Sequence, residues 1–337
     1  MLNRRAFLCG FLSFAAAAGL PGGVAGAMAA GLKVMASSYP VWLLTRDVTA
    51  RTPGLTPELL VAASAGCPHD YTLTPRDMLR LSSSSTLIIN GRGFEAFLSS
   101  ALDQLKKLSV IDAGGNIPAL PEDDDHHDGS DHHEEHEHHH DHPHGNPHYF
   151  SSPARAAVMV KNIAEGLASL APGEAAVLRA TGSELEGRLN KLGEEVAKLG
   201  KSGSGVDFIL QHDALSWFFH DAGLSVMGVL QEEADEPPSA AALGALVKKM
   251  KAGKKRCIVV TEPQFPERVA RSLARDAGAG LISLDPLASG PANPPAGYYE
   301  KVMAANVMAP PAITNIARIC CKIRLKLKTF PGNHRIP

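Results

Sequence analysis

Apolar residues along the chain follow two alternating patterns: short continuous runs, and longer segments in which they recur every three or four positions. The short runs predict strands and the longer segments predict helices. The predicted strands cover residues 32–36, 58–63, 86–90, 109–112, 206–210, 225–230, 256–261 and 280–284. The helices predicted between them cover 41–50, 75–82, 94–105, 214–222, 239–252 and 266–277. This alternation favours an α/β fold with two lobes, each a four-stranded parallel sheet flanked by helices.

The segment that joins the two lobes is predicted to be helical. Ser152 and Pro153 suit the N-cap and the first position of a helix, which should end near residues 171–173. A second, long connecting helix is expected over 174–199, where leucines recur at helical spacing. At ~1.5 Å per residue it would reach about 39 Å, which is enough to run along both lobes. Such a connector is stiffer than a Gly/Ser linker and should limit hinge motion.

The beginning of the chain has the pattern of an export signal. Arg4 and Arg5 precede an apolar stretch over 6–20, and small residues close it at 27–29. The pair of arginines also suits a twin-arginine signal. A membrane-anchoring helix is the alternative, although the stretch is short for a bilayer. The predicted divisions are a cleavable signal over 1–29, an N-terminal lobe over 30–172, a connecting helix over 173–200, a C-terminal lobe over 201–321 and a basic tail over 322–337.

Acidic residues and histidines are concentrated in one run, over residues 122–144. The run contains ten histidines, ten acidic residues and no large apolar side chain, so it should form a disordered surface loop. Its histidines are His126, His127, His132, His133, His136, His138, His139, His140, His142 and His144. Many overlapping ligand sets favour several weak metal sites, so the loop is predicted to be an accessory that gathers metal and passes it inward. The alternative is a solvated spacer that binds metal without a role in its delivery. Outside this run and the basic tail, the body of the chain is close to neutral, which argues against nucleic acid as the main partner.

Four other residues follow strands or precede the connecting helices. His69 comes after the second predicted strand, while His212 and Asp285 directly follow strands of the second half. His148 precedes the helices between the lobes. Ligands of open α/β sheets bind beyond the carboxyl ends of strands, so three imidazoles and one carboxylate could meet there and bind Zn²⁺. Each residue alone also has an ordinary structural explanation, such as a hydrogen-bonded histidine or an Asp-Pro turn.

Longer motifs around these residues resemble a known family. GCPHDYTLTPRDMLRL followed by LIINGRGFEAFL resembles the first-lobe signature of the zinc-binding periplasmic proteins of ABC importers. NPHYFSSP resembles the family's second histidine motif, usually Asp-Pro-His-x-Trp. LQHDALSWFFHDAGL, EEADEPPSAAALGAL, TEPQFPERVARSLARDAG and LISLDPL follow in the family's order, so the resemblance covers about residues 32–300. It implies one metal in an inter-lobe cleft, with His69, His148 and His212 as histidine ligands and Asp285 as the carboxylate.

The chain departs from this family at several positions. Pro68 stands where some zinc members have an acidic residue, and Tyr149 and Phe150 replace the usual residues after the second histidine. Beyond Asn306 the resemblance weakens, and the basic tail has no family role. Manganese-binding members resemble a site with two histidines and two carboxylates, so His212 favours Zn²⁺ here. The same nitrogen-rich ligand set also suits Cu²⁺ and Ni²⁺.

The resemblance also bears on the cysteines, because it includes zinc members with a disulfide at corresponding places. It implies a bond from Cys257 to Cys320 or Cys321. Such a bond closes a loop of roughly 64 residues and would stabilise the fold by about 4 kcal/mol. Cys67 is either a buried thiol or an additional ligand.

The resulting interpretation is an exported, monomeric solute-binding protein of the periplasm rather than an enzyme. It would bind Zn²⁺ as its transported ligand and deliver it to an ABC permease in the inner membrane. A periplasmic zinc buffer or adhesin would use the same site. A zinc hydrolase would need an open coordination position and a general base. The chain has no H-E-x-x-H motif, and Glu262 is the one nearby acid that follows a predicted strand.

Overall fold

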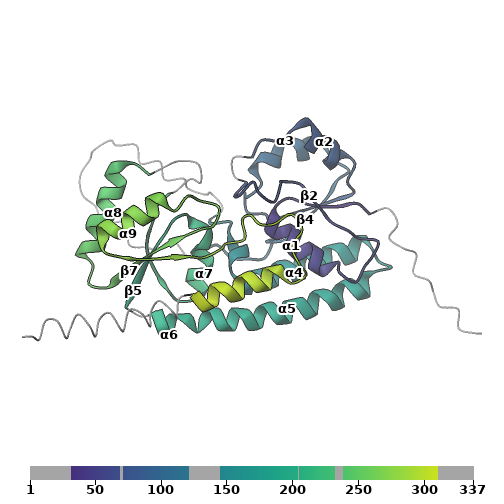
Figure 1. The fold of residues 1–337 in the computed structure, drawn as a ribbon. Coiled ribbons are helices and arrows are strands. Elements are labelled where there is room, and N and C mark those ends of the chain that lie inside the picture. Colours follow the sequence, from purple (N-terminus) through teal and green to yellow (C-terminus); the bar gives the residue numbers. More distant parts are fainter. Residues whose placement is uncertain (1–31, 69–70, 121–144, 204, 232–237, 310–337) are drawn as a thin grey trace, which may run out of the picture.

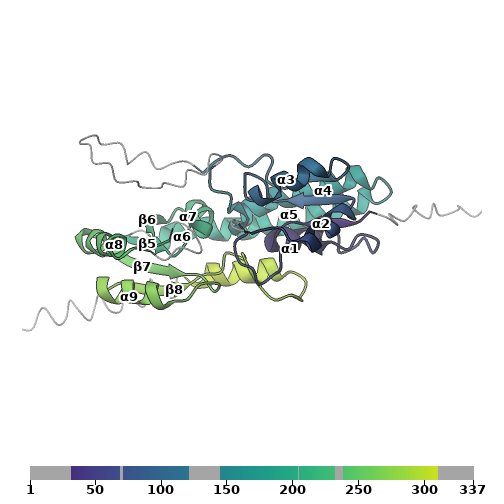
Figure 2. The same cartoon turned by 90° about the horizontal axis from the view of Figure 1, so that it is seen from above.

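The computed structural model describes residues 32–68, 71–120, 145–203, 205–231 and 238–309. The predicted export signal, the His/acid run, the basic tail and His69 lie outside these residues, as do Cys320 and Cys321. Within the described ranges, no helix has both the length and the apolarity needed to cross a membrane. The described chain forms two lobes that lie side by side along a pair of long helices (Figures 1 and 2).

The first lobe is built on a parallel sheet with the strand order β2-β1-β3-β4. Its strands are β1 (Val34–Ala36), β2 (Glu58–Leu59), β3 (Thr86–Ile89) and β4 (Ser109–Asp112). Its helices are α1 (Tyr39–Val48), α2 (Pro75–Ser82) and α3 (Ser99–Gln104), with a short 3-10 turn η1 (Ala96–Leu98) before α3. Helix α2 begins where expected because Thr74 and Asp77 form a capping box.

The single helix predicted over 94–105 was wrong in its first part, where a turn stands instead. The cause is Glu95, whose carboxylate accepts hydrogen bonds from the backbone nitrogens of Asn90 (2.7 Å) and Gly91 (3.0 Å). These bonds hold residues 90–95 in a tight turn, in which Gly91 and Gly93 have positive φ angles of 91° and 77°. A regular helix therefore begins only at Ser99.

The second lobe repeats this arrangement with the strand order β6-β5-β7-β8, again all parallel. Its strands are β5 (Val206–Leu210), β6 (Ser225–Val229), β7 (Arg256–Thr261) and β8 (Gly280–Ser283). Its helices are α7 (Ser216–Asp221), α8 (Ala240–Ala252) and α9 (Arg268–Ala277), with a 3-10 turn η4 (Asp213–Leu215) before α7. The prediction of two α/β lobes, each with a four-stranded parallel sheet, is therefore confirmed.

The lobes are connected by helices, as predicted. The 3-10 turn η3 (Tyr149–Ser151) leads into α4 (Pro153–Leu170), and α5 (Ala175–Ala197) then runs back beneath both lobes to the short α6 (Leu199–Gly203) (Figure 1).

After β8 the chain crosses back to the first lobe. There Tyr39 donates a hydrogen bond to the carbonyl of Pro291, and Arg46 donates one to that of Pro294. A last helix over 298–309, drawn in yellow, then lies along α5. The predicted C-terminal lobe over 201–321 therefore includes a segment that packs against the first lobe.

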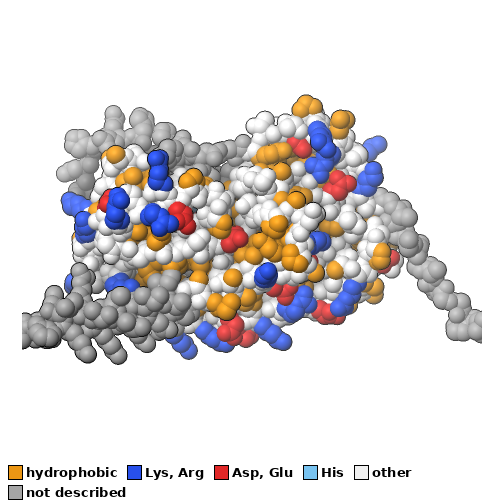
Figure 3. Space-filling model, viewed as in Figure 1, with side chains coloured by type: hydrophobic (Ala, Val, Ile, Leu, Met, Phe, Trp, Pro, Cys, Tyr) orange, Lys and Arg blue, Asp and Glu red, His pale blue; other side chains and the backbone are white. Residues whose placement is uncertain are grey.

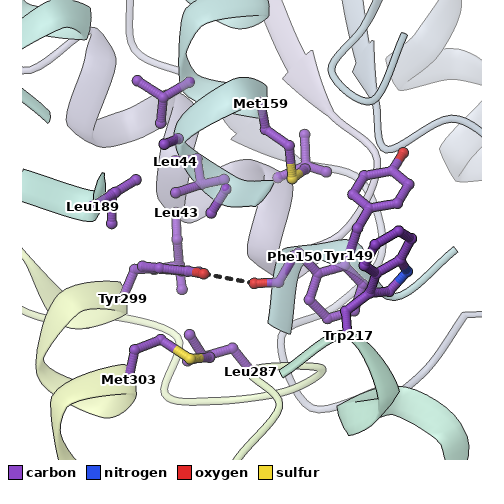
Figure 4. Close-up of a cluster of buried hydrophobic side chains, with 14 of the residues drawn as sticks. Leu43, Leu44, Tyr149, Phe150, Met159, Leu189, Trp217, Leu287, Tyr299 and Met303 are labelled. Atoms are coloured by element: carbon purple, nitrogen blue, oxygen red, sulfur yellow. Dashed lines mark hydrogen bonds between the residues drawn. The ribbon is translucent and has the colours of Figure 1, made fainter. Parts of the chain in front are cut away.

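One hydrophobic core extends through both lobes and the helices that connect them. Tyr299 and Met303 of the last helix lie in it together with Leu43, Leu189 and Phe150 (Figure 4). The Tyr299 hydroxyl donates a 2.6 Å hydrogen bond to the Phe150 carbonyl, which satisfies both polar groups within the core. The lobes therefore share apolar packing as well as covalent connections.

The close approach of α4 and α5 can be tested with two glycines of α5. A Cβ at Gly182 would lie 2.6 Å from the Cβ of Ala164, whereas a Cβ at Gly187 would have no neighbour within 4 Å. We expect Gly187→Ala to raise the free energy of unfolding by about 1 kcal/mol, because alanine favours helix over glycine. Gly182→Ala should lower it by about 1–3 kcal/mol, because the helices must move apart. Urea unfolding of both variants measures the difference, and equal effects would contradict the tight packing at Gly182.

Charged side chains are scattered over the visible surface, with Lys and Arg interspersed among Asp and Glu (Figure 3). Single large apolar side chains, such as Leu79 and Met308, are also exposed.

Candidate metal centre

Two of the predicted histidines meet where the lobes join. His148 lies at the start of η3, just before α4, and His212 directly follows the buried strand β5. Their side chains are almost fully buried, and their ring centroids are 5.3 Å apart. Both residues lie at the positions that their neighbours in sequence predict: the carboxyl end of a strand and the entry to the connecting helices.

His148 is held between aromatic rings on one side and polar groups on the other. The rings of Phe94 and Phe150 meet it edge to face at 5.6 and 5.8 Å. Its Nδ1 lies 3.2 Å from Asn146 Oδ1, and its Nε2 lies 3.2 Å from the Sγ of Cys67. A hydrogen bond from Nδ1 to Asn146 directs Nε2 toward the Sγ of Cys67.

Asp213 lies beside both histidines. Its Oδ1 is 3.2 Å from His148 Nδ1 and 3.4 Å from His212 Nε2. Each of the three residues offers one ligand atom, and these atoms lie within 4.8 Å of one another. Two ligands of one tetrahedral Zn²⁺, each at ~2.1 Å, are separated by about 3.4 Å. The spacing of His212 Nε2 and Asp213 Oδ1 therefore suits two ligands of one cation.

Three acidic side chains gather around these histidines: Asp213, Glu262 and Asp285. Glu262 follows β7, and its side chain is fully buried. Burial raises the pKa of Glu262 well above its usual range, and the negative charges of Asp213 and Asp285 raise it further. Burial also raises the pKa of Asp285. Carboxyl groups thus gather at the carboxyl ends of β5, β7 and β8, where a divalent cation would compensate their charge.

The predicted ligand set is partly assembled within the described residues. His148 and His212 come together, whereas His69 lies outside the described part of the chain. Asp285 follows β8, but its Oδ1 accepts a 2.7 Å hydrogen bond from the Leu287 amide, and it does not belong to the group formed by the histidines and Asp213. Its role as a ligand stays a prediction. Asp213 was missed, although its place directly after His212, at the end of β5, is a signal in the sequence.

A cavity of about 580 Å³ opens beside the histidines, between loops of the two lobes. Its walls include Cys67 from the first lobe and Phe265 from the second. Cys67 contacts His148, and the Phe265 ring lies 5.7 Å from the ring of His212. The cavity therefore lies one side chain away from each histidine, behind Cys67 and Phe265.

Another sequence prediction concerns Cys257. Cys257 is buried at the start of β7, and its predicted disulfide stays a prediction because Cys320 and Cys321 lie outside the described residues. Tyr71 lines the cavity and anchors α2 through a 2.9 Å hydrogen bond to Asp77.

The chain was compared with known protein families and with individual relatives. A model of the family described as "Zinc-uptake complex component A periplasmic", ZnuA, matches residues 34–309. The high-affinity zinc uptake system protein ZnuA of Haemophilus ducreyi is 31% identical over 265 residues, which are 75% of this chain and 84% of that protein. The zinc-binding lipoprotein AdcA of Streptococcus pneumoniae is 28% identical over 264 residues, which are 77% of this chain and 50% of AdcA. The chain thus spans about half the length of this relative.

Among solved structures, the SBP FpvC from Pseudomonas aeruginosa in complex with Mn²⁺ has the same fold. It matches with a TM-score of 0.69 at 22% identity, and the match covers 84% of this chain and 97% of that chain. The likeness confirms the architecture of two lobes on a helical frame.

Proposed function

Because the chain belongs to the ZnuA family of periplasmic zinc-uptake components, we propose that it captures Zn²⁺ between its lobes and delivers it to an ABC permease of the inner membrane. The observation that carries this proposal is the pair of buried histidines, His148 and His212, with Asp213 at the spacing of metal ligands. Burying two imidazoles and a carboxylate together is costly unless they are paired, and these side chains are ligand types that Zn²⁺ takes in proteins.

We propose that His69 from the first lobe completes the site and that one carboxylate supplies the fourth ligand: Asp285, as the resemblance implies, or Asp213, which lies in one group with the two histidines. The segment before His69 supports this, because Cys67 already contacts His148. Three imidazole nitrogens and one oxygen form a closed tetrahedral set, which suits Zn²⁺ better than a harder cation such as Mn²⁺. A closed set leaves no coordination position for a reacting water, so the site favours binding and release over hydrolysis.

The His/acid run should be dispensable for the tight site. We expect a protein without residues 122–144 to retain one tightly held Zn²⁺ per chain and to lose only weaker, additional metal. The physical reason is that the tight site is built by residues on the rigid frame, whereas the run offers many overlapping ligand sets. Metal content after dialysis and calorimetric titration of both proteins measure the stoichiometry. Disappearance of the tight Zn²⁺ would show that the run, and not the inter-lobe residues, forms the site.

Growth under zinc starvation distinguishes a transport role from zinc buffering or adhesion. A strain that lacks the gene should grow poorly in zinc-depleted medium, and the intact gene should restore growth. Restoration by a variant that binds no zinc would contradict a role in uptake.

A further inference from the structure

The segment that carries His148 is attached to both lobes through buried polar contacts. On the side of the first lobe, the Asn90 side chain donates a 3.0 Å hydrogen bond to the Pro147 carbonyl, and the Tyr149 hydroxyl donates one to the Asn90 carbonyl. On the side of the second lobe, the indole Nε1 of Trp217 donates a 3.0 Å hydrogen bond to the Asn146 carbonyl. Trp217 lies on α7, the helix that follows His212 and Asp213.

Asn146 forms hydrogen bonds with residues on both sides of the candidate metal centre, His148 and Asp213. Its Oδ1 accepts a 2.8 Å hydrogen bond from the backbone nitrogen of His148. Its Nδ2 donates to the carbonyl and to Oδ2 of Asp213, at 3.2 and 3.0 Å. The backbone nitrogen of His148 can only donate and the Asp213 carbonyl can only accept, so the orientation of the amide is determined.

A partly buried ion pair holds Trp217 in place. Arg155, in the first turn of α4, makes two hydrogen bonds to the Asp221 carboxylate at 2.7 and 2.9 Å. Ser152 donates a third, at 2.6 Å, to the same carboxylate. The guanidinium group of Arg155 also lies over the Trp217 ring, 4.8 Å from its centroid. In Figure 4, Trp217 lies next to Tyr149 and Phe150, the two residues after His148.

These contacts connect the start of α4, which follows His148, to α7, which follows His212. We propose that Trp217 and the Arg155–Asp221 pair are positioning residues that hold His148 against His212 as a preformed two-histidine half-site for a divalent cation. The inference rests on the proposed function. It adds that this half of the site keeps its geometry without metal, so cation binding does not have to order these two side chains.

The chain contains a matched control for Trp217. Its other tryptophan, Trp42, also donates its Nε1 to a backbone carbonyl, that of Pro57 at 3.1 Å, and also has an arginine over its ring, Arg46 at 5.3 Å. Trp42 lies on α1 and contacts neither histidine in any described interaction. Replacing either tryptophan by phenylalanine removes one indole hydrogen bond and one cation–π contact, but only Trp217 is connected to the metal centre.

The test is zinc affinity by competition with a chromophoric chelator, in the full chain. We expect Trp217→Phe to weaken zinc binding by about 10- to 100-fold, the usual range for residues that orient metal ligands, and Trp42→Phe to leave it unchanged. Asp221→Asn, which removes the ion pair, should also weaken binding. Glu184→Gln, which breaks the exposed Arg51–Glu184 pair, should have no effect.

A second readout separates positioning from a general loss of stability. With Co²⁺ in place of Zn²⁺, the visible absorption reports ligand geometry, and it should change in Trp217→Phe but not in Trp42→Phe. Equal affinity and equal spectra in the two variants would overturn the inference, provided that the parent chain binds one Zn²⁺ tightly. If the parent chain itself binds no Zn²⁺ tightly, it is the proposed function that fails.

Discussion

His212→Ala should abolish tight zinc binding, with the dissociation constant raised by more than about 100-fold. His212 is buried at the end of β5, and no other described imidazole lies close enough to His148 to replace it. The substitution also removes the imidazole whose Nε2 lies 3.4 Å from Asp213 Oδ1. Zinc remaining after dialysis and the affinity from chelator competition measure the loss.

The matched control is His220→Ala, eight residues further along. This histidine lies on α7 with 42% of its side chain exposed, and its Nδ1 contacts Asp221 at 3.1 Å. Its loss should leave zinc affinity within about threefold of the parent, because the Arg155–Asp221 pair is kept. If His212→Ala binds zinc as tightly as His220→Ala does, the metal centre assigned to His148 and His212 is wrong.

A second large effect is expected from Glu95, which is buried in the turn after β3. Burial raises the pKa of Glu95 to about 7, although hydrogen bonds from Ser37, Asn90 and Gly91 lower it in part. The folded protein therefore keeps a proton on Glu95 between pH 4.5 and 7, where an unfolded glutamate has lost it. Because the folded state binds more protons in this window, this residue makes the free energy of unfolding fall as pH rises, by about 3 kcal/mol in total.

Glu95→Gln should remove this slope. The variant is also expected to have a lower free energy of unfolding at every pH, because its amide group cannot accept all three hydrogen bonds. The test is therefore the change of this free energy with pH, and not its absolute value. Urea unfolding of the metal-free protein at several pH values from 4.5 to 7.5 measures it. Glu194→Gln, at an exposed position of α5, provides the control. A slope equal to that of the parent chain would show that Glu95 is ionised in the folded protein throughout this range.

The periodicity of apolar residues was sufficient to predict the lobes, because parallel strands are buried on both faces and read as short apolar runs. All eight predicted strands are present, with shifts of a few residues at their ends. The turn at residues 90–95 could not be predicted in this way, because Glu95 counts as an ordinary helix-forming residue until its carboxylate is seen bonded to the backbone.

The proximity of the two histidines was predictable from their positions at the ends of elements, whereas contacts that depend on tertiary packing were not. His148 and His212 follow from their places at the ends of elements. The contribution of Asp213 depends on the rotamer that directs its Oδ1 toward two imidazoles. The attachment through Trp217 and Arg155 depends on how α7 packs against α4, which local sequence does not encode.

The continuous core has a mechanical consequence. Two segments, α5 and the crossing after β8, connect the lobes, and apolar side chains fill the space between them. The two lobes and the helices between them therefore form one rigid unit. Rotation of one lobe against the other would disrupt the apolar packing that they share. We expect the exposed loops near the carboxyl ends of the strands to move more easily than this shared core. If a membrane permease extracts the ion, as proposed above, it would therefore have to move those loops while the two lobes keep their relative orientation.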